Sequence, residues 1–128
     1  MRLLLDTQIA LWALTDNPKL SKTARDLILD RGNDIYFSAA TVWEIAIKHS
    51  LARGDMPVSG SEAAGLLKKA GFVELPMTAA HASAIETLPP HHADPFDRML
   101  VAQAMTEPLR LITHDRLLSQ YGDSVQFV

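Results

Sequence analysis

The chain has 128 residues, a formal net charge of −3 and no cysteine, with 48% hydrophobic and 21% charged residues. This composition is ordinary for one globular domain over residues 1–128, and it excludes a disulfide framework and a thiolate metal site. The negative charge argues against a protein that holds nucleic acid on a broad basic surface. We find no membrane-length apolar segment and no signal peptide, so we expect a cytoplasmic protein without a membrane partner.

Apolar strand-like runs alternate with helical segments along the chain. The first part predicts a strand at residues 2–5, helices at 7–14 and from Ser21 to Gly32, a strand at 35–37 and a helix at 39–51. The second part predicts a helix from Ser59 to Gly71, a strand at 72–75, helices from Thr78 to about Glu86 and from Asp94 to about Glu107, a strand at 110–113 and a candidate fifth strand at 125–128. The loop-rich stretches 53–60 and 88–95 are short enough to lie inside one domain.

Local signals support several of these boundaries. Ser38 is a favourable N-cap for the helix at 39–51, and Ser59 with Glu62 matches a capping box. Pro95 occupies a helix position where proline is favoured, because the first turn needs no donor there. The helix at 39–51 is apolar on nearly every side, which predicts that it is buried within the protein.

Strands that alternate with helices pair in parallel, with helices on both faces of the sheet. We therefore predict an α/β fold with a parallel sheet of four to five strands. Ligands of such sheets bind outside the carboxyl ends of the strands. Asp6 follows the first strand and Asp115 follows the strand at 110–113, so the fold should bring both carboxylates to this edge.

Four acids are candidates for one cluster, and each also has a structural alternative: Asp6, Glu44, Asp97 and Asp115. The two acids that follow strands would cap the next helix or turn. Glu44 would pair with Lys48 four residues later, although its neighbours in the helix are strongly apolar. Asp97 would interact with the dipole of its helix. Asp97 is preferred to Asp94 as a functional acid, because Asp94 is already explained as the N-cap.

Carboxylates packed together repel one another and take up protons unless a cation neutralises them. Ligation by oxygen alone suits Mg²⁺ or Mn²⁺. The histidines at 91, 92 and 114 are expected in loops, and octahedral oxygen sites rarely use imidazole, so we leave them outside the ligand set. The four acids therefore predict a divalent metal site.

Four segments resemble the PIN domain, and specifically the VapC-type ribonuclease toxins of bacterial toxin–antitoxin pairs: LLLDT (3–7), SAATVWEIAIK (38–48), LPPHHADPFDRMLVAQA (88–104) and LITHD (111–115). The resemblance runs over nearly the whole chain, and the order and spacing of the acids agree. It implies that the catalytic, metal-binding acids are Asp6, Glu44, Asp97 and Asp115. Thr7 and Thr113 fall where small hydroxyl residues orient those acids or a bound water, and Asp94 falls at a commonly acidic position. Gln8 is a departure, because this subgroup often has histidine there, but it lies outside the acid set.

The resemblance further implies metal-dependent hydrolysis of RNA, usually by a homodimer, and a cognate antitoxin that silences the enzyme. A bound cation would offset the negative charge of the protein, and Arg98, Lys48 and His114 lie near enough in sequence to the acids to contact phosphates. The apolar helices at 7–14 and 39–51 offer surfaces for an amphipathic segment of a partner. The alternative is that they bury each other or form the dimer contact.

Three other classes of protein fit parts of the sequence. A two-component receiver domain has paired acids after its first strand and a lysine after its last strand, whereas this chain has only Asp6 there and no lysine beyond Lys69. A phosphatase of the haloacid dehalogenase type has an acid where this chain has Gln8. The third class is a PIN-like scaffold that binds RNA or a protein without cleavage. The presence of all four acids favours the enzyme.

Overall fold

In residues 1–51 and 56–128, which the computed structural model describes, five parallel strands form one sheet with the spatial order β3-β2-β1-β4-β5. The strands are β1 (Arg2–Leu5), β2 (Asp34–Ser38), β3 (Val73–Leu75), β4 (Arg110–Thr113) and β5 (Val125–Phe127). The predicted α/β fold and the parallel pairing, including the candidate fifth strand, are confirmed. Part of the expected loop at 53–60 lies outside the described residues.

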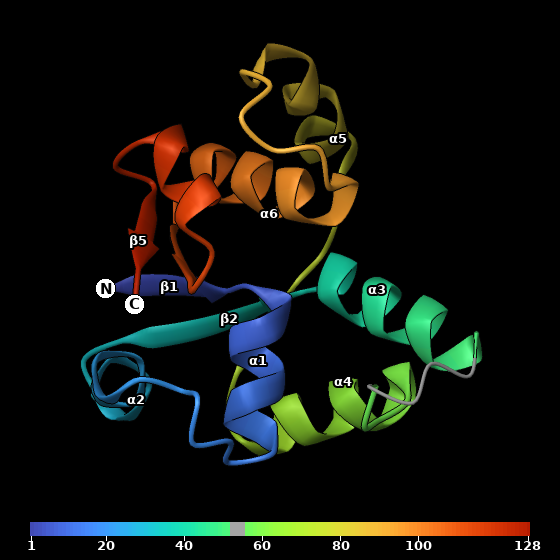
Figure 1. Ribbon diagram of the computed structural model, residues 1–128, viewed down its shortest axis with the longest axis vertical. Helices are drawn as coiled ribbons and strands as arrows, with labels where there is room; N and C mark the ends of the chain where they lie inside the picture. Colours follow the sequence, from blue (N-terminus) through green and yellow to red (C-terminus); the bar gives the residue numbers. More distant parts are fainter. Residues whose placement is uncertain (52–55) are drawn as a thin grey trace.

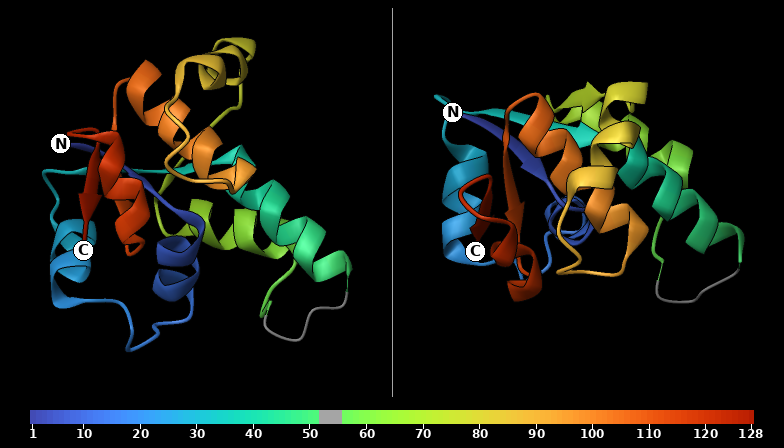
Figure 2. Two further views of the ribbon diagram at one scale, coloured as in Figure 1. Left: turned by 45° about the horizontal axis from the view of Figure 1, so that its top comes forward. Right: turned by 90° about the horizontal axis from the view of Figure 1, so that it is seen from above.

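Helices cover both faces of this sheet. They are α1 (Thr7–Leu14), α2 (Lys22–Leu29), α3 (Ala39–Ser50), α4 (Gly60–Lys69), α5 (Ala79–Ala84) and α6 (Pro95–Thr106), with the short 3₁₀ helices η1 (Ile85–Thr87) and η2 (Arg116–Tyr121). α5 and α6 lie on one side of the sheet, and α1, α2 and α4 lie on the other (Figure 1). α3 continues from the carboxyl end of β2, packs on α4 and meets the first part of α6 (Figure 2).

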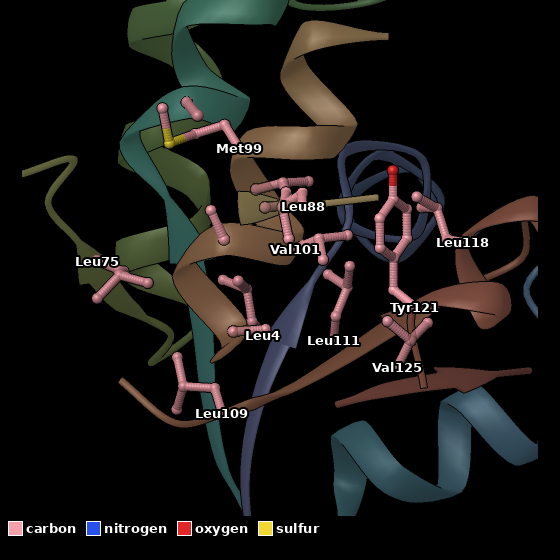
Figure 3. Packing of buried hydrophobic residues seen from close by; sticks show 14 residues of the cluster. Leu4, Leu75, Leu88, Met99, Val101, Leu109, Leu111, Leu118, Tyr121 and Val125 are labelled. Atoms are coloured by element: carbon pink, nitrogen blue, oxygen red, sulfur yellow. The ribbon is translucent and has the colours of Figure 1, made fainter. Parts of the chain in front are cut away.

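β1 separates two hydrophobic cores. Leu4 belongs to the core beneath α6, whereas Leu3 and Leu5 belong to the core beneath α1 and α2, and all three are fully buried. Figure 3 shows Leu4 and its neighbour Leu111 packed with Val101 of α6. Because successive strand residues point to opposite faces, an unbroken leucine run supplies both cores at once. Burial of each leucine stabilises the fold by about 1.5–3 kcal/mol.

The strand order reverses between β1 and β4. From β1 the chain moves outward to β2 and β3, and it then returns to β4 and β5 on the other side of β1. The segments that leave β1 and β4 therefore diverge, and a crevice forms at the carboxyl ends of these two strands. The Asp6 N–H donates to the Ile112 carbonyl at 3.0 Å, which places Asp6 against β4 at this point.

The observed ends of the elements follow their caps, with two differences from the predictions. The capping box of Ser59 and Glu62 is present, and α4 begins at Gly60. α2 ends before the predicted stop at Gly32, because Asp30 is extended and its carboxylate accepts the Gly32 N–H at 2.8 Å, which closes a turn. The helix expected to reach about Glu86 divides into α5 and η1.

α3 is less buried than its apolar sequence predicts. Ala40 and Ile45 are fully buried, but Trp43 is 51% exposed and Ile47 is 36% exposed. The prediction of burial on all sides is therefore wrong, because β2, α4 and α6 cover only part of the helix. Within the described part of the chain, no helix is long and apolar enough to cross a membrane.

Two glycines of α4 test how closely α3 and α4 pack. A Cβ at Gly60 would lie 2.8 Å from the Ala46 Cβ, whereas a Cβ at Gly65 would meet nothing within 4 Å. We expect Gly60→Ala to lower the free energy of unfolding by about 1–3 kcal/mol, because α4 must move away from α3. We expect Gly65→Ala to raise it by about 0.5–1 kcal/mol through helix propensity. Urea denaturation measures both changes, and a stabilising Gly60→Ala would contradict the packing.

Candidate metal centre

The four acids line one cleft of about 610 Å³ at the carboxyl edge of the sheet. They come from the end of β1, from α3, from the first turn of α6 and from the end of β4, in the order Asp6, Glu44, Asp97 and Asp115. Parallel strands that end at one edge explain how residues from opposite ends of the chain meet here. The structure thus brings the acids together, while their role as metal ligands stays a prediction.

Asp6 is buried and held in one orientation by hydrogen bonds to both carboxylate oxygens. The Thr113 hydroxyl donates to one oxygen at 2.5 Å, and the Ile9 N–H donates to the other at 2.8 Å. Burial raises the pKa of Asp6 to about 6, the two hydrogen bonds oppose this shift, and the charges of Asp115 and Glu44 add to it. Asp6 is therefore both the N-cap of α1 and a member of the acid cluster.

The two predicted hydroxyl residues behave differently. Thr113 joins two acids, because its hydroxyl donates to Asp6 and accepts the Asp115 N–H at 3.0 Å. The Thr7 hydroxyl instead pairs with the Thr41 hydroxyl of α3 at 3.1 Å. Thr7 thus connects α1 to the helix that carries Glu44, and within the described residues it makes no hydrogen bond to an acid.

The pKa of Asp97 is raised further than that of Asp6. Burial raises its pKa to about 7, with further contributions from the charges of Asp94, Asp6 and Glu44, while His92 opposes the shift. Asp94 caps α6 by accepting the N–H of Phe96 at 2.8 Å and that of Asp97 at 3.1 Å. The predicted cap thus fixes the backbone from which Asp97 enters the cleft.

His92 lies against the acids, although the sequence argument left the histidines outside the site. Its Nε2 is 2.9 Å from Asp115 Oδ2 and 3.5 Å from Asp97 Oδ2. Its Nδ1 accepts the Asp94 N–H at 3.1 Å, so the ring proton of the neutral form is on Nε2 and points to Asp115. Polar atoms of His92, Asp97 and Asp115 all lie within 4.8 Å of one another. The sequence signal available was the position of His92 two residues before the N-cap of α6.

Glu44 forms the ion pair with Lys48 that the sequence offered as its structural role. One of its two carboxylate oxygens nevertheless has no hydrogen-bond partner among the described residues. Oε2 is 2.6 Å from Lys48 Nζ. Oε1 is buried, and no hydrogen-bond partner for it exists among the described residues. An unsatisfied buried oxygen costs about 1–3 kcal/mol, so a ligand that reached this atom would satisfy an acceptor that the ion pair with Lys48 leaves unused.

Lys48 and His114, two of the three side chains that the sequence suggested for phosphate contacts, line the cleft. Arg98 is not in the cleft lining, and its guanidinium donates to the Pro89 carbonyl and the Tyr121 hydroxyl, both at 3.1 Å. Arg116, which the sequence argument did not consider, lines the cleft together with Lys48. Arg98 thus holds the loop before α6, and Arg116 is the arginine in the lining of the cleft.

A family model described as the PIN domain matches residues 3–123. The chain belongs to the PIN domain family. None of the curated proteins matches this PIN domain. The fold is similar to that of VapBC2 from Rickettsia felis bound to a DNA fragment from their promoter, with a TM-score of 0.71, 15% identity, and coverage of 100% of this chain and 98% of that chain.

Two other solved structures share the fold. For FitAcB from Neisseria gonorrhoeae, the TM-score is 0.62 at 22% identity, with coverage of 98% of this chain and 96% of that chain. For the PIN domain endonuclease Utp24, it is 0.53 at 18% identity, with coverage of 94% and 75%. At these identities the likeness concerns the fold, so the chemistry of this PIN domain must be argued from its own residues.

The cleft of this PIN domain fits a divalent cation. Its donors are carboxylate oxygens, which Mg²⁺ and Mn²⁺ prefer, with one imidazole beside them. Burial, with added repulsion from neighbouring acids, raises the pKa of Asp6 and Asp97, so a bound cation would favour their ionised forms. The unpartnered Oε1 of Glu44 is a further free ligand atom. These observations make the cluster a candidate metal centre.

The raised pKa values of Asp6 and Asp97 predict how the stability of the metal-free protein depends on pH. Folded Asp97 has a pKa of about 7 against 3.8 for an ordinary aspartate, so the folded state binds more protons than the unfolded state between these values. Stability should therefore fall as the pH rises from about 4 to about 7. In Asp97→Asn, we expect a smaller fall and a gain of about 1–3 kcal/mol at pH 8 over the wild type.

Urea denaturation in a chelator, at pH values across this window, measures the effect. The matched control is Asp123→Asn, which removes an exposed acid that does not line the cleft. This variant should follow the pH dependence of the wild type. An unchanged pH dependence in Asp97→Asn would mean that burial and the neighbouring charges do not raise the pKa of Asp97.

Proposed function

We propose that this PIN domain is an endoribonuclease that depends on Mg²⁺ or Mn²⁺ and hydrolyses RNA phosphodiester bonds, and that it is the toxin of a toxin–antitoxin pair. The observation that carries the proposal is the cleft in which four carboxylates converge, one of them with an unpartnered buried oxygen. The similarity of the fold to the VapBC structures supports the toxin assignment. Hydrolysis of cellular RNA would place the protein in the cytoplasm.

The residues that would hold the ion are Asp6, Glu44, Asp97 and Asp115. When bound, the ion supplies a water of lowered pKa and screens the charge on the phosphate. Thr113 keeps Asp6 in a fixed orientation through its hydroxyl, and the Nε2–H of His92 does the same for Asp115. Lys48 neutralises one oxygen of Glu44. Asp94 holds the first turn of α6, and with it the backbone of Asp97.

The alternative is a PIN-like scaffold that binds RNA or a protein without cleaving it. Such a scaffold has no need for an acid cluster whose members raise one another's pKa, because the repulsion lowers the stability of the folded state. The retained acids favour the enzyme.

Asp97→Asn tests the enzyme directly. The variant should fold and lose Mg²⁺-dependent cleavage of total RNA by on the order of a hundredfold or more, because the amide removes one negative ligand from the cluster. Cleavage is followed on gels with Mg²⁺, with Mn²⁺ and with a chelator. Asp123→Asn, purified in the same way, should cleave like the wild type.

Binding of the cation is measured separately from cleavage. Mn²⁺ should raise the Tm of the wild type, because a ligand that binds only the folded state stabilises it. The rise should be smaller in Asp115→Asn. Full cleavage by folded Asp97→Asn, or a melting curve indifferent to millimolar Mn²⁺, would refute the proposed chemistry.

The proposed partners are an antitoxin protein and a second copy of this chain. Exposed apolar side chains on and after α3 support a protein contact at this helix: Trp43, Ile47 and Leu51. An apolar helix face of this kind suits an amphipathic segment of another chain. An arginine of the antitoxin would bind two carboxylates of the cleft or exclude the cation.

Growth of a bacterium tests the toxin assignment. Expression of this protein alone should slow growth, and co-expression with the protein encoded beside it should restore growth. Expression of Asp97→Asn at the same level should be harmless, because the harm comes from cleavage. Harmless expression of a wild-type protein that cleaves RNA after purification would refute the toxin assignment and leave the nuclease intact.

A further inference from the structure

Three aromatic rings and one guanidinium group form a continuous row of contacts beside the acid cluster. The ring of His114 lies 5.5 Å from that of Trp12 in an edge-on contact and 5.2 Å from that of Phe127 in a stacked contact. The guanidinium carbon of Arg116 lies 4.3 Å from the centre of the Phe127 ring. We call the four residues Trp12, His114, Arg116 and Phe127 the stacking ledge.

The stacking ledge adjoins the carboxylates. Trp12, His114 and Arg116 line the same cleft as the four acids. In sequence, His114 and Arg116 flank Asp115, and Trp12 belongs to the helix that Asp6 caps. The turn that places Asp115 in the cleft therefore also places the ring of His114 and the guanidinium group of Arg116 there.

Arg116 is exposed, and within the described residues its side chain makes no hydrogen bond and no ion pair. Its guanidinium group lies over the face of Phe127, which orients the guanidinium plane but leaves the N–H donors at its edge unused. Lys48, the other long cation of the cleft, is paired with Glu44. Arg116 thus has both a planar surface and donors available for a ligand.

We propose that the stacking ledge binds an unpaired nucleotide of the RNA next to the bond that is cleaved, an inference that rests on the proposed function. The base stacks on the ledge, and the N–H edge of Arg116 binds a phosphate. Bases stack on aromatic rings and on guanidinium planes only when their own faces are uncovered, as in loops and single strands. In this chain the 15 acids outnumber the 12 lysines and arginines, so stacking supplies affinity that net charge does not.

Tryptophan fluorescence reports on the stacking ledge directly. The chain has two tryptophans, and Trp43→Phe leaves Trp12 as the one reporter. A chelator keeps the RNA intact during the titration. An unstructured RNA of about ten nucleotides should quench this fluorescence, whereas the same RNA annealed to its complement should not.

Further substitutions separate stacking from charge. Arg116→Ala and Phe127→Leu should each weaken binding of the single strand by about tenfold. Arg116→Lys keeps the charge but removes the guanidinium plane. Compared with Arg116→Ala, it should regain the salt dependence of wild-type binding but not the wild-type affinity. The matched control is Arg110→Ala, which removes an exposed arginine at the other end of β4 and should change neither quantity.

Three results would each overturn the proposed binding of RNA at the stacking ledge. They are equal binding of single strand and duplex, full affinity in Arg116→Lys, and unchanged affinity in Phe127→Leu. A ledge that binds a protein instead would show no quenching by RNA and a loss of antitoxin binding in Arg116→Ala. The two proposals fail separately. Quenching by RNA without any metal-dependent cleavage refutes the nuclease and supports the ledge, whereas cleavage with unchanged affinity in the ledge variants refutes the ledge alone.

Discussion

The burial of mutually repelling carboxylates in one cleft is the constraint on which the rest of the structure depends. Asp6 and Asp97 have raised pKa values, so the folded protein keeps them together at a cost in stability when they are ionised. The two cores on either side of β1 supply the stability that offsets this cost. Direct hydrogen bonds from Thr113 and His92 then fix the orientation of the acids. The same arrangement that destabilises the metal-free protein is the one that attracts a cation.

A buried polar network joins α3 and α6, the two helices that contribute Glu44 and Asp97 to the cleft. The Gln103 side chain of α6 accepts the Ser38 hydroxyl at 2.5 Å, and Ser38 in turn caps α3. The Gln103 amide also donates to the Pro76 carbonyl at 3.3 Å. His81 completes the network, with its Nε2 at 2.5 Å from Glu107 at the end of α6. Because each buried group has a partner, the network specifies one separation between α3 and α6, and with it the width of the cleft.

The sequence predicted those features that depend on periodicity and strand ends. The leucine run before Asp6 and the apolar run before Asp115 were sufficient for parallel strands and for two acids at one edge. The features that it did not predict depend on contacts between distant segments. His92 approaches Asp115 from a loop whose sequence has no periodic pattern. Arg116 is placed by its contact with Phe127, a residue of β5. The exposure of Trp43 was likewise not predictable, because apolar composition does not say how much of a helix its neighbours cover.

The central position of β1 also has a consequence for the order of events during synthesis. β1 and Asp6 emerge from the ribosome well before β4, which pairs with β1 and precedes Asp115. A growing chain therefore carries an incomplete acid cluster until the segment with Asp115 has been made. Parallel strands so distant in sequence also pair slowly. A nuclease built in this way would stay inactive until the last of its acids has been synthesised and β4 has paired with β1.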